Sequence, residues 1–160
     1  KQIRVKQEEI EAKYKDELEA LGRQRLVALS AGYLAALKKK SDDVQALAQL
    51  GILYGENGLY TEALEQFQKL LAVDKDNAMA LNNIGNIYYL QERLDEARQA
   101  YEASLKTEPG DTGIMVNLTR VHLKAGKKDD ARKVFQDAAA ADPRALRRYG
   151  DLAAELGVTK

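Results

Sequence analysis

Residues 95–101 read DEARQAY, and the chain writes the same heptapeptide in related letters 34 positions to either side, as TEALEQF at 61–67 and DDARKVF at 129–135. Each copy opens with a threonine or aspartate that can cap a helix, followed by an acidic residue suited to a first turn. Each then places an alanine four residues before an aromatic ring, so that both lie on one helix face. The pattern predicts three equivalent helices, with caps at Thr61, Asp95 and Asp129.

A second helical pattern precedes each copy, with large side chains at i, i+3 and i+7 and a glycine beside the middle one in two of the three cases. In the middle unit, Gly85 is expected to face Ala97 at a close helix crossing. The third unit has Thr119 and His122 where the others have glycine and tyrosine, so looser packing is expected there. Two helices per unit follow. The residues that set the first-helix pattern are Leu47, Leu50, Gly51 and Tyr54, then Leu81, Ile84, Gly85 and Tyr88, then Met115, Leu118, Thr119 and His122.

The 34-residue period and the order of leucine, glycine, tyrosine, alanine, aromatic and proline resemble the tetratricopeptide repeat. The resemblance covers residues 44–77, 78–111 and 112–145, although the usual tryptophan slot holds leucine or methionine and the first unit lacks the proline. It implies an all-α fold: a right-handed superhelical solenoid of antiparallel helix pairs with a concave groove.

The pattern also extends beyond the three units. Residues 27–43 superimpose on the second helix of a unit, so residues 1–43 are expected to form one long N-terminal helix whose second half is a half-repeat. At the other end, residues 146–160 are expected to form a C-terminal capping helix. The N-terminal segment has an apolar stripe close to coiled-coil spacing but too short to establish one, which leaves open a solvated helix or one that pairs with another copy. The stripe consists of Ile3, Ile10, Tyr14, Leu18 and Leu21.

Composition excludes several classes. The 160 residues are 45% hydrophobic and 31% charged with two prolines, which favours long solvated helices. Twenty-five basic residues balance twenty-five acidic ones, so no global field favours nucleic acid or an anionic membrane. There is no run of eighteen apolar residues, so no membrane insertion is expected of this fragment. The absence of cysteine fits either a cytoplasmic or a periplasmic location.

The chemistry of catalysis is poorly represented. The single histidine, His122, stands in a core slot, and there is no cysteine to form a nucleophile or a thiolate metal site. The glycines at 51, 55 and 58 lie in a helical context rather than in a phosphate loop. We therefore expect no enzyme activity, no metal site and no cofactor.

The geometry of the family places the outward residues of each first helix along the groove. Carboxamides on this face can both donate to and accept from an extended peptide backbone. Basic residues gather at the C-terminal end, where residues 112–160 hold ten basic and six acidic residues, so an acidic peptide is favoured there. The candidate groove residues are Gln49, Asn82, Asn83, Asn86, Tyr89, Asn117, Arg120, Lys124 and Arg147.

The clamp with which some members of the family hold two carboxylates is not matched, because Asn82 and Asp151 occupy positions that should be basic. Two function classes remain open. The first is a protein-interaction scaffold that binds a peptide or helix of a partner in the concave groove. The alternative is a structural oligomerisation or spacer module that forms a homodimer through its N-terminal helix.

Overall fold

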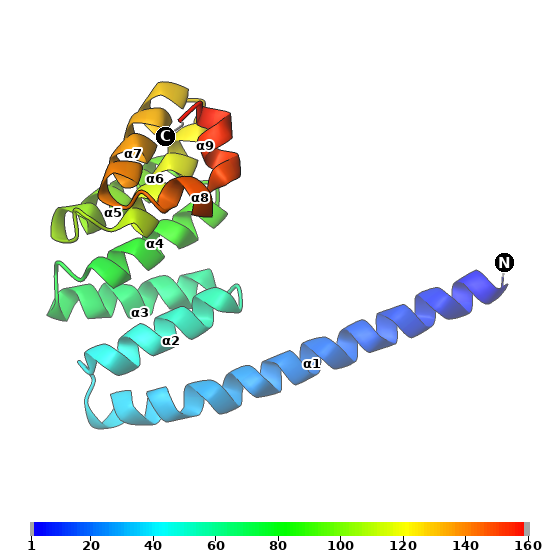
Figure 1. Cartoon of the computed structure of the whole chain (residues 1–160). Helices are drawn as coiled ribbons and strands as arrows, with labels where there is room; N and C mark the ends of the chain where they lie inside the picture. The colour runs from blue at the N-terminus through cyan, green and yellow to red at the C-terminus, as the bar shows by residue number, and fades with distance from the viewer. Residues whose placement is uncertain (1, 159–160) are drawn as a thin grey trace.

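The computed structural model describes residues 2–158, with side chains from residue 13 onward except at residue 18, and it is helical with no strand in that range (Figure 1). Helices of 13 and 14 residues alternate through the middle of the chain. The helices are α1 (Gln2–Lys39), α2 (Val44–Glu56), α3 (Tyr60–Val73), α4 (Ala78–Leu90), α5 (Leu94–Thr107), α6 (Thr112–Lys124), α7 (Lys128–Ala141), α8 (Ala145–Arg148) and α9 (Gly150–Leu156).

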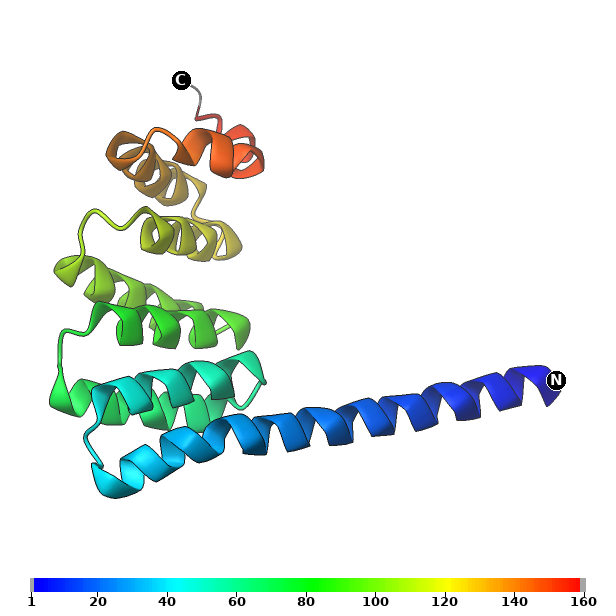
Figure 2. The ribbon, with the colours of Figure 1, turned by 60° about the horizontal axis from the view of Figure 1, so that its bottom comes forward.

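Helices α2 to α7 form three antiparallel pairs, α2–α3, α4–α5 and α6–α7, which stack into a curved column (Figures 1 and 2). Helix α1 joins the column at its C-terminal end and projects away from it, so that the N-terminus lies far from the rest of the molecule. The prediction of an all-α solenoid is confirmed.

The first helix of each pair begins with a side-chain cap. Asp43, Asn77 and Asp111 each accept a hydrogen bond of 2.9 Å from the backbone N–H three residues on. These bonds satisfy N–H groups that have no partner inside the helix. The first unit has Lys75 where the later units have proline, and Asn77 caps the helix α4 that follows it.

The second helices begin earlier than the sequence suggested. Helices α3, α5 and α7 start at Tyr60, Leu94 and Lys128, and their cap positions make no side-chain hydrogen bond. The prediction that Thr61, Asp95 and Asp129 are caps is wrong, because these residues lie one position inside the first turn. There the two aspartates still face the positive end of the helix dipole.

The turns inside the pairs explain the shift. Gly58 and Gly126 have φ of 75° and 74°, and the residue in the same slot of the middle pair, Glu92, has φ of 62°. A left-handed residue reverses the chain tightly, so the next helix starts within two residues. Among the described residues, Glu92 is the only one with a side chain in this conformation.

We expect Glu92→Gly to raise the free energy of unfolding by about 0.5–1 kcal/mol, because a side chain costs about 1–2 kcal/mol in the left-handed region. The loss of the exposed Lys124–Glu92 ion pair at 3.0 Å offsets part of this gain. Urea unfolding measures the difference. Gly126→Ala is the matched control and should lower the free energy of unfolding. A Glu92→Gly variant less stable than the parent, or a Gly126→Ala variant more stable than the parent, would contradict this account of the turn.

The core repeats with the sequence. Ala63, Ala97 and Ala131 are completely buried, and the ring four residues later, at Phe67, Tyr101 and Phe135, is at most 2% exposed. These residues belong to successive apolar clusters along the column. Burial of the same slots in every pair gives each pair the same cross-section and lets the pairs stack.

In the first two pairs, the glycine of the first helix faces the ring and not the alanine. A Cβ on Gly85 would lie 2.7 Å from Tyr101 Cε1, and one on Gly51 would lie 2.8 Å from Phe67 Cε1. The prediction that Gly85 faces Ala97 is therefore wrong by one helical turn. The ring is the larger group, so it is the ring that needs the space left by a missing side chain.

The third pair has no glycine in this slot, yet it is closed. Thr119 and Phe135 are both 0% exposed, and the Thr119 hydroxyl donates to the Met115 carbonyl at 2.9 Å. The looser packing expected at this slot is not seen there. A hydroxyl returned to its own helix can be buried without an unsatisfied hydrogen bond.

The C-terminal segment forms two short helices, α8 and α9, rather than one capping helix. The break lies at Tyr149, and Gly157 ends α9 with φ of 67°. Leu156 is 0% exposed among the apolar residues of α7, and its carbonyl accepts a hydrogen bond of 2.8 Å from Arg132 Nε. These contacts cover the last pair at its open end.

Helix α1 runs without interruption through Gly22 and Gly32, as expected for a single long helix. Its C-terminal part packs on α2, with Leu37 against the apolar cluster of the first pair. Between residues 13 and 25 the described side chains are exposed, apart from the half-buried Ala20. These side chains of the first half of α1 are therefore little covered by the array of their own chain.

Candidate functional site

Three hollows follow one another along the face that α2, α4 and α6 form, and together they make a trough. Their volumes are about 300, 240 and 660 Å³ from the N-terminal to the C-terminal end. Asn86 and Leu90 line both the first and the second hollow, and Tyr89 and Arg120 line both the second and the third. The shared walls make the trough continuous across three helices.

The first hollow lies between α2 and α4. Its lining includes Gly51 and Phe67, whose ring packs closely against the glycine. Asn83 is on its wall, with its Nδ2 group bonded to the Met79 carbonyl at 2.8 Å. The amide oxygen of Asn83 makes no hydrogen bond among the described residues, so it can accept one from a ligand.

The second hollow is organised around Asn86. The hydroxyl of Tyr101 donates to Asn86 Oδ1 at 2.7 Å, and Asn117 Nδ2 donates to the same oxygen at 3.2 Å and to Asn82 Oδ1 at 3.3 Å. Burial raises the pKa of Tyr101, so its hydroxyl stays protonated and remains a donor. The network fixes the amide groups of two successive helices and leaves the Nδ2 donors of Asn86 without a hydrogen-bond partner in the described part of the chain.

The third hollow brings cations and tyrosine rings together. The Arg120 guanidinium lies 5.7 Å from the centre of the Tyr149 ring, and Lys124 Nζ lies 5.1 Å from the centre of the Tyr89 ring. Both distances are within the range of cation–π attraction. Arg120 also donates to Asn117 Oδ1 at 3.3 Å, which links this hollow to the network of the second one.

Six of the nine residues proposed from the sequence line the trough: Asn83, Asn86, Tyr89, Asn117, Arg120 and Lys124. Asn82 does not line the trough, but its Oδ1 atom accepts a hydrogen bond from Asn117. Gln49 and Arg147 are exposed and do not line any of the three hollows. The structure therefore gathers the residues of α4 and α6 and leaves two candidates outside.

Sequence reasoning missed several residues of the third hollow. Arg148 and Tyr149 line it in the position assigned to Arg147, because the chain turns at Tyr149 between α8 and α9. Asp151 and Glu155 of α9 also line this hollow. Gly150 was the available signal, since a glycine inside a short apolar pattern marks a possible helix break.

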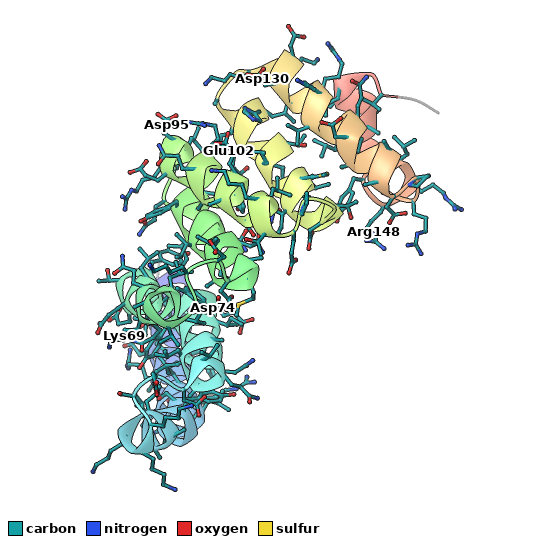
Figure 3. All side chains as sticks on the ribbon, turned by 90° about the vertical axis from the view of Figure 1, so that its left-hand side faces the viewer. Lys69, Asp74, Asp95, Glu102, Asp130 and Arg148 are labelled. Carbon is teal, nitrogen blue, oxygen red and sulfur yellow. The ribbon has the colours of Figure 1, made fainter. Side chains whose placement is uncertain are left out.

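His122 is buried near charged residues of α5, of α7 and of the turn before α7. Figure 3 shows Glu102 of α5 and Asp130 of α7 on the same side of the array, and both carboxylates act on this imidazole. Burial nevertheless lowers the pKa of His122, and its Nδ1 atom has no hydrogen-bond partner among the described residues. Lys127 and Arg98 add to the lowering. The fold therefore favours the neutral imidazole.

A histidine whose pKa is lower in the folded than in the unfolded state gives full stability above its unfolded pKa, and this stability declines as pH falls from there toward the folded pKa. We expect thermal stability to fall between pH 7 and 5, and His122→Tyr, which restores the residue found in the other two pairs, to flatten that part of the profile. His122 is the sole histidine of the chain. Melting curves of both proteins at several pH values test this; parallel profiles would contradict it.

No group of three or more metal-ligating residues occurs within the described range, and none of the described helices is long and apolar enough to cross a membrane. The trough is lined by hydrogen-bonding amides, tyrosine rings, cations and the carboxylates of Glu56, Asp151 and Glu155.

Comparisons with known proteins agree with the architecture. Two family models, each described as a tetratricopeptide repeat, match residues 48–112 and 88–156. A search of curated proteins finds no match. Among solved structures, a crystal structure of MamA has a TM-score of 0.71 at 21% identity and covers 85% of this chain and 81% of that chain. A MamA RS-1 ArsTM double mutant has a TM-score of 0.69 at 21% identity, covering 86% and 84%.

At this identity the likeness to MamA shows a shared fold. The family matches go further, because together they run through all three helix pairs and into α9. Tetratricopeptide repeats typically serve as non-enzymatic scaffolds for protein interaction. The chain belongs to the tetratricopeptide repeat family.

Proposed function

We propose that the trough binds an extended segment of a partner protein. The observation that carries this proposal is the continuity of three hollows whose walls alternate hydrogen-bonding amides with apolar side chains. Leu90 is 60% exposed on the ridge between the first two hollows, where it can contact side chains of a ligand. The amide groups of Asn83 and Asn86 offer an acceptor and donors to its backbone.

The partner segment carries an acidic residue near the C-terminal end of the trough. Arg120 and Arg148 stand on the walls of the third hollow, and no ion pair joins either of them to a carboxylate in the described part of the chain. An acidic side chain or a free C-terminus could contact both. We expect no nucleic-acid binding, since the chain has no net charge.

A quantitative pull-down tests the trough. We expect the Arg120→Glu variant to recover at least about tenfold less of the partner proteins than the parent chain does, because a repulsive charge replaces an attractive one. Lys133→Glu is the matched control, since it makes the same charge change on an exposed residue of α7 outside the trough. If parent and Arg120→Glu recover the same proteins in the same amounts, the trough is not the working surface.

A titration of the purified partner then separates the contributions. The Arg120→Glu penalty should shrink as salt rises, because exposed charges are screened. Leu90→Ser should weaken binding by a similar amount at every salt concentration, since it removes an apolar contact. A penalty independent of salt in Arg120→Glu would rule out an acidic ligand while leaving the trough as the site.

A second function, self-association through α1, is favoured by a separate observation. Tyr14 and Leu21 are 62% and 61% exposed on a helix that projects from the array (Figures 1 and 2). Large apolar side chains on an isolated helix are typical of an interaction surface. Light scattering of the full chain and of a Tyr14→Ser, Leu21→Ser variant tests it; a monomeric parent would exclude this function.

A further inference from the structure

The second half of α1 is the second helix of a unit whose first helix is missing. Residues 34 positions apart occupy equivalent slots, and the slot of Ala63, Ala97 and Ala131 is 0% exposed in every complete pair. In α1 the same slot holds Leu29, which is 48% exposed. The side of α1 that a first helix would cover is therefore open among the described residues.

The open face continues along the projecting part of the helix. Tyr14, Leu21 and Leu29 are spaced by seven and eight residues, close to two helical turns each, so they lie along one side. Gly32 falls on the same side, exactly five turns from Tyr14, and a Cβ built on it would meet nothing within 4 Å. One face of α1 thus has large apolar residues in its first half and room for a large side chain in its second half.

We propose that a second copy of the chain covers this face, with the two α1 helices antiparallel and related by a two-fold axis. In the complete pairs, the helix that covers this slot runs antiparallel to the second helix. The first half of a partner α1 approaches in that same direction when the helices pair antiparallel. Each copy then provides the missing cover for the other, which is the closed arrangement of an isologous dimer.

Charge supports the antiparallel sense. Lys38, Lys39 and Lys40 are exposed at the C-terminal end of α1, and the sequence near its other end has glutamates at positions 8, 9 and 11. When Tyr14 of one copy lies beside Gly32 of its partner, position 8 lies beside Lys38. Lys38 of each helix then lies at the glutamate segment of the other, which follows the basic residues Lys1, Arg4 and Lys6, whereas parallel helices would place the three lysines together.

The inference rests on the proposed self-association and adds its face and direction. The first test is the dimer dissociation constant of the full chain, measured by sedimentation equilibrium. We expect Leu21→Glu to raise it by at least about tenfold, because a buried charge replaces an apolar contact. Val27→Glu is the matched control: Val27 is 69% exposed on the same helix but lies on another side, six residues from Leu21, so its variant should keep the parental constant.

The second test is a distance. Because the chain has no cysteine, Lys39→Cys carries a spin label at a single position, beyond the paired stretch between Tyr14 and Gly32. In the antiparallel dimer the two labels are 32 residues apart along the helices, or roughly 48 Å at 1.5 Å per residue. Pulsed electron resonance should give a distance near this value. In a parallel dimer the labels would lie on neighbouring helices, within roughly 30 Å of one another.

The outcomes separate the two proposals. A parent chain that stays monomeric overturns both the self-association and this inference. A dimer with a short label distance, or one that Leu21→Glu leaves intact, keeps self-association and overturns the antiparallel pairing through this face. Three results together support the inference: Leu21→Glu dissociates the dimer, Val27→Glu leaves it intact, and the distance between the labels is long.

Discussion

Gly85→Ala should lower the free energy of unfolding by about 1–3 kcal/mol, although alanine is ordinarily the better helix former. The added methyl carbon would lie 2.7 Å from Tyr101 Cε1, far inside contact distance. The ring cannot move away cheaply, because its hydroxyl is bonded to Asn86 Oδ1 at 2.7 Å and its side chain is 2% exposed. Overpacking therefore outweighs the gain in helix propensity.

Gly55→Ala is the matched control on the equivalent helix of the first pair. A Cβ at this position would have Ala63 Cβ at 3.9 Å, which is ordinary contact. Here only the propensity gain remains, so stability should rise by up to about 1 kcal/mol. Urea unfolding of both variants measures the two changes. Destabilisation of similar size in both would show that the ring contact is not what requires glycine.

Ala97→Leu should also cost about 1–3 kcal/mol, since Ala97 is 0% exposed in a close-packed cluster with Tyr101, Ile114 and Leu118. Three added carbons have no free volume to occupy. The melting temperature of the variant measures the effect. An unchanged melting temperature would mean that the second helix is rotated relative to the position seen in the structure.

The reverse change at the equivalent slot of α1 provides the control. Leu29→Ala should alter stability by less than about 0.5 kcal/mol in dilute protein, because Leu29 is 48% exposed and has no first helix against it. Leucine in this repeat slot is then costly at position 97 and nearly neutral at position 29. A large loss of stability in Leu29→Ala would show that α1 is covered within the single chain.

Local sequence predicted which segments are helical, because the determining information is short in range. The apolar period of 3.6, the caps at Asn77 and Asp111, and the glycine turns act within a few residues. Recurrence of the pattern every 34 residues then predicted stacking, since equivalent pairs bury equivalent faces. The fold class followed from these two features.

The candidate site was predictable only where it stayed in register with the repeats. Asn83, Asn86, Asn117 and Arg120 occupy regular slots of α4 and α6, and all four line the trough. Arg148 and Tyr149 were missed because the break between α8 and α9 shifts the register at the end of the array. A single residue, Tyr149, forms this break, and whether a helix breaks at such a position depends on the apolar surface that the neighbouring helices can bury.

The sequence by itself determined the helices, their order and the repeating core of this protein, because a regular pattern of small and large residues admits few ways to pack. Tertiary structure alone decided that Tyr101 rather than Ala97 meets Gly85, and that Asn86 Oδ1 is shared by Tyr101 and Asn117. Both contacts join helices whose relative rotation is set by all the side chains between them. Only the assembled array fixes that rotation, and with it the face that α1 leaves open.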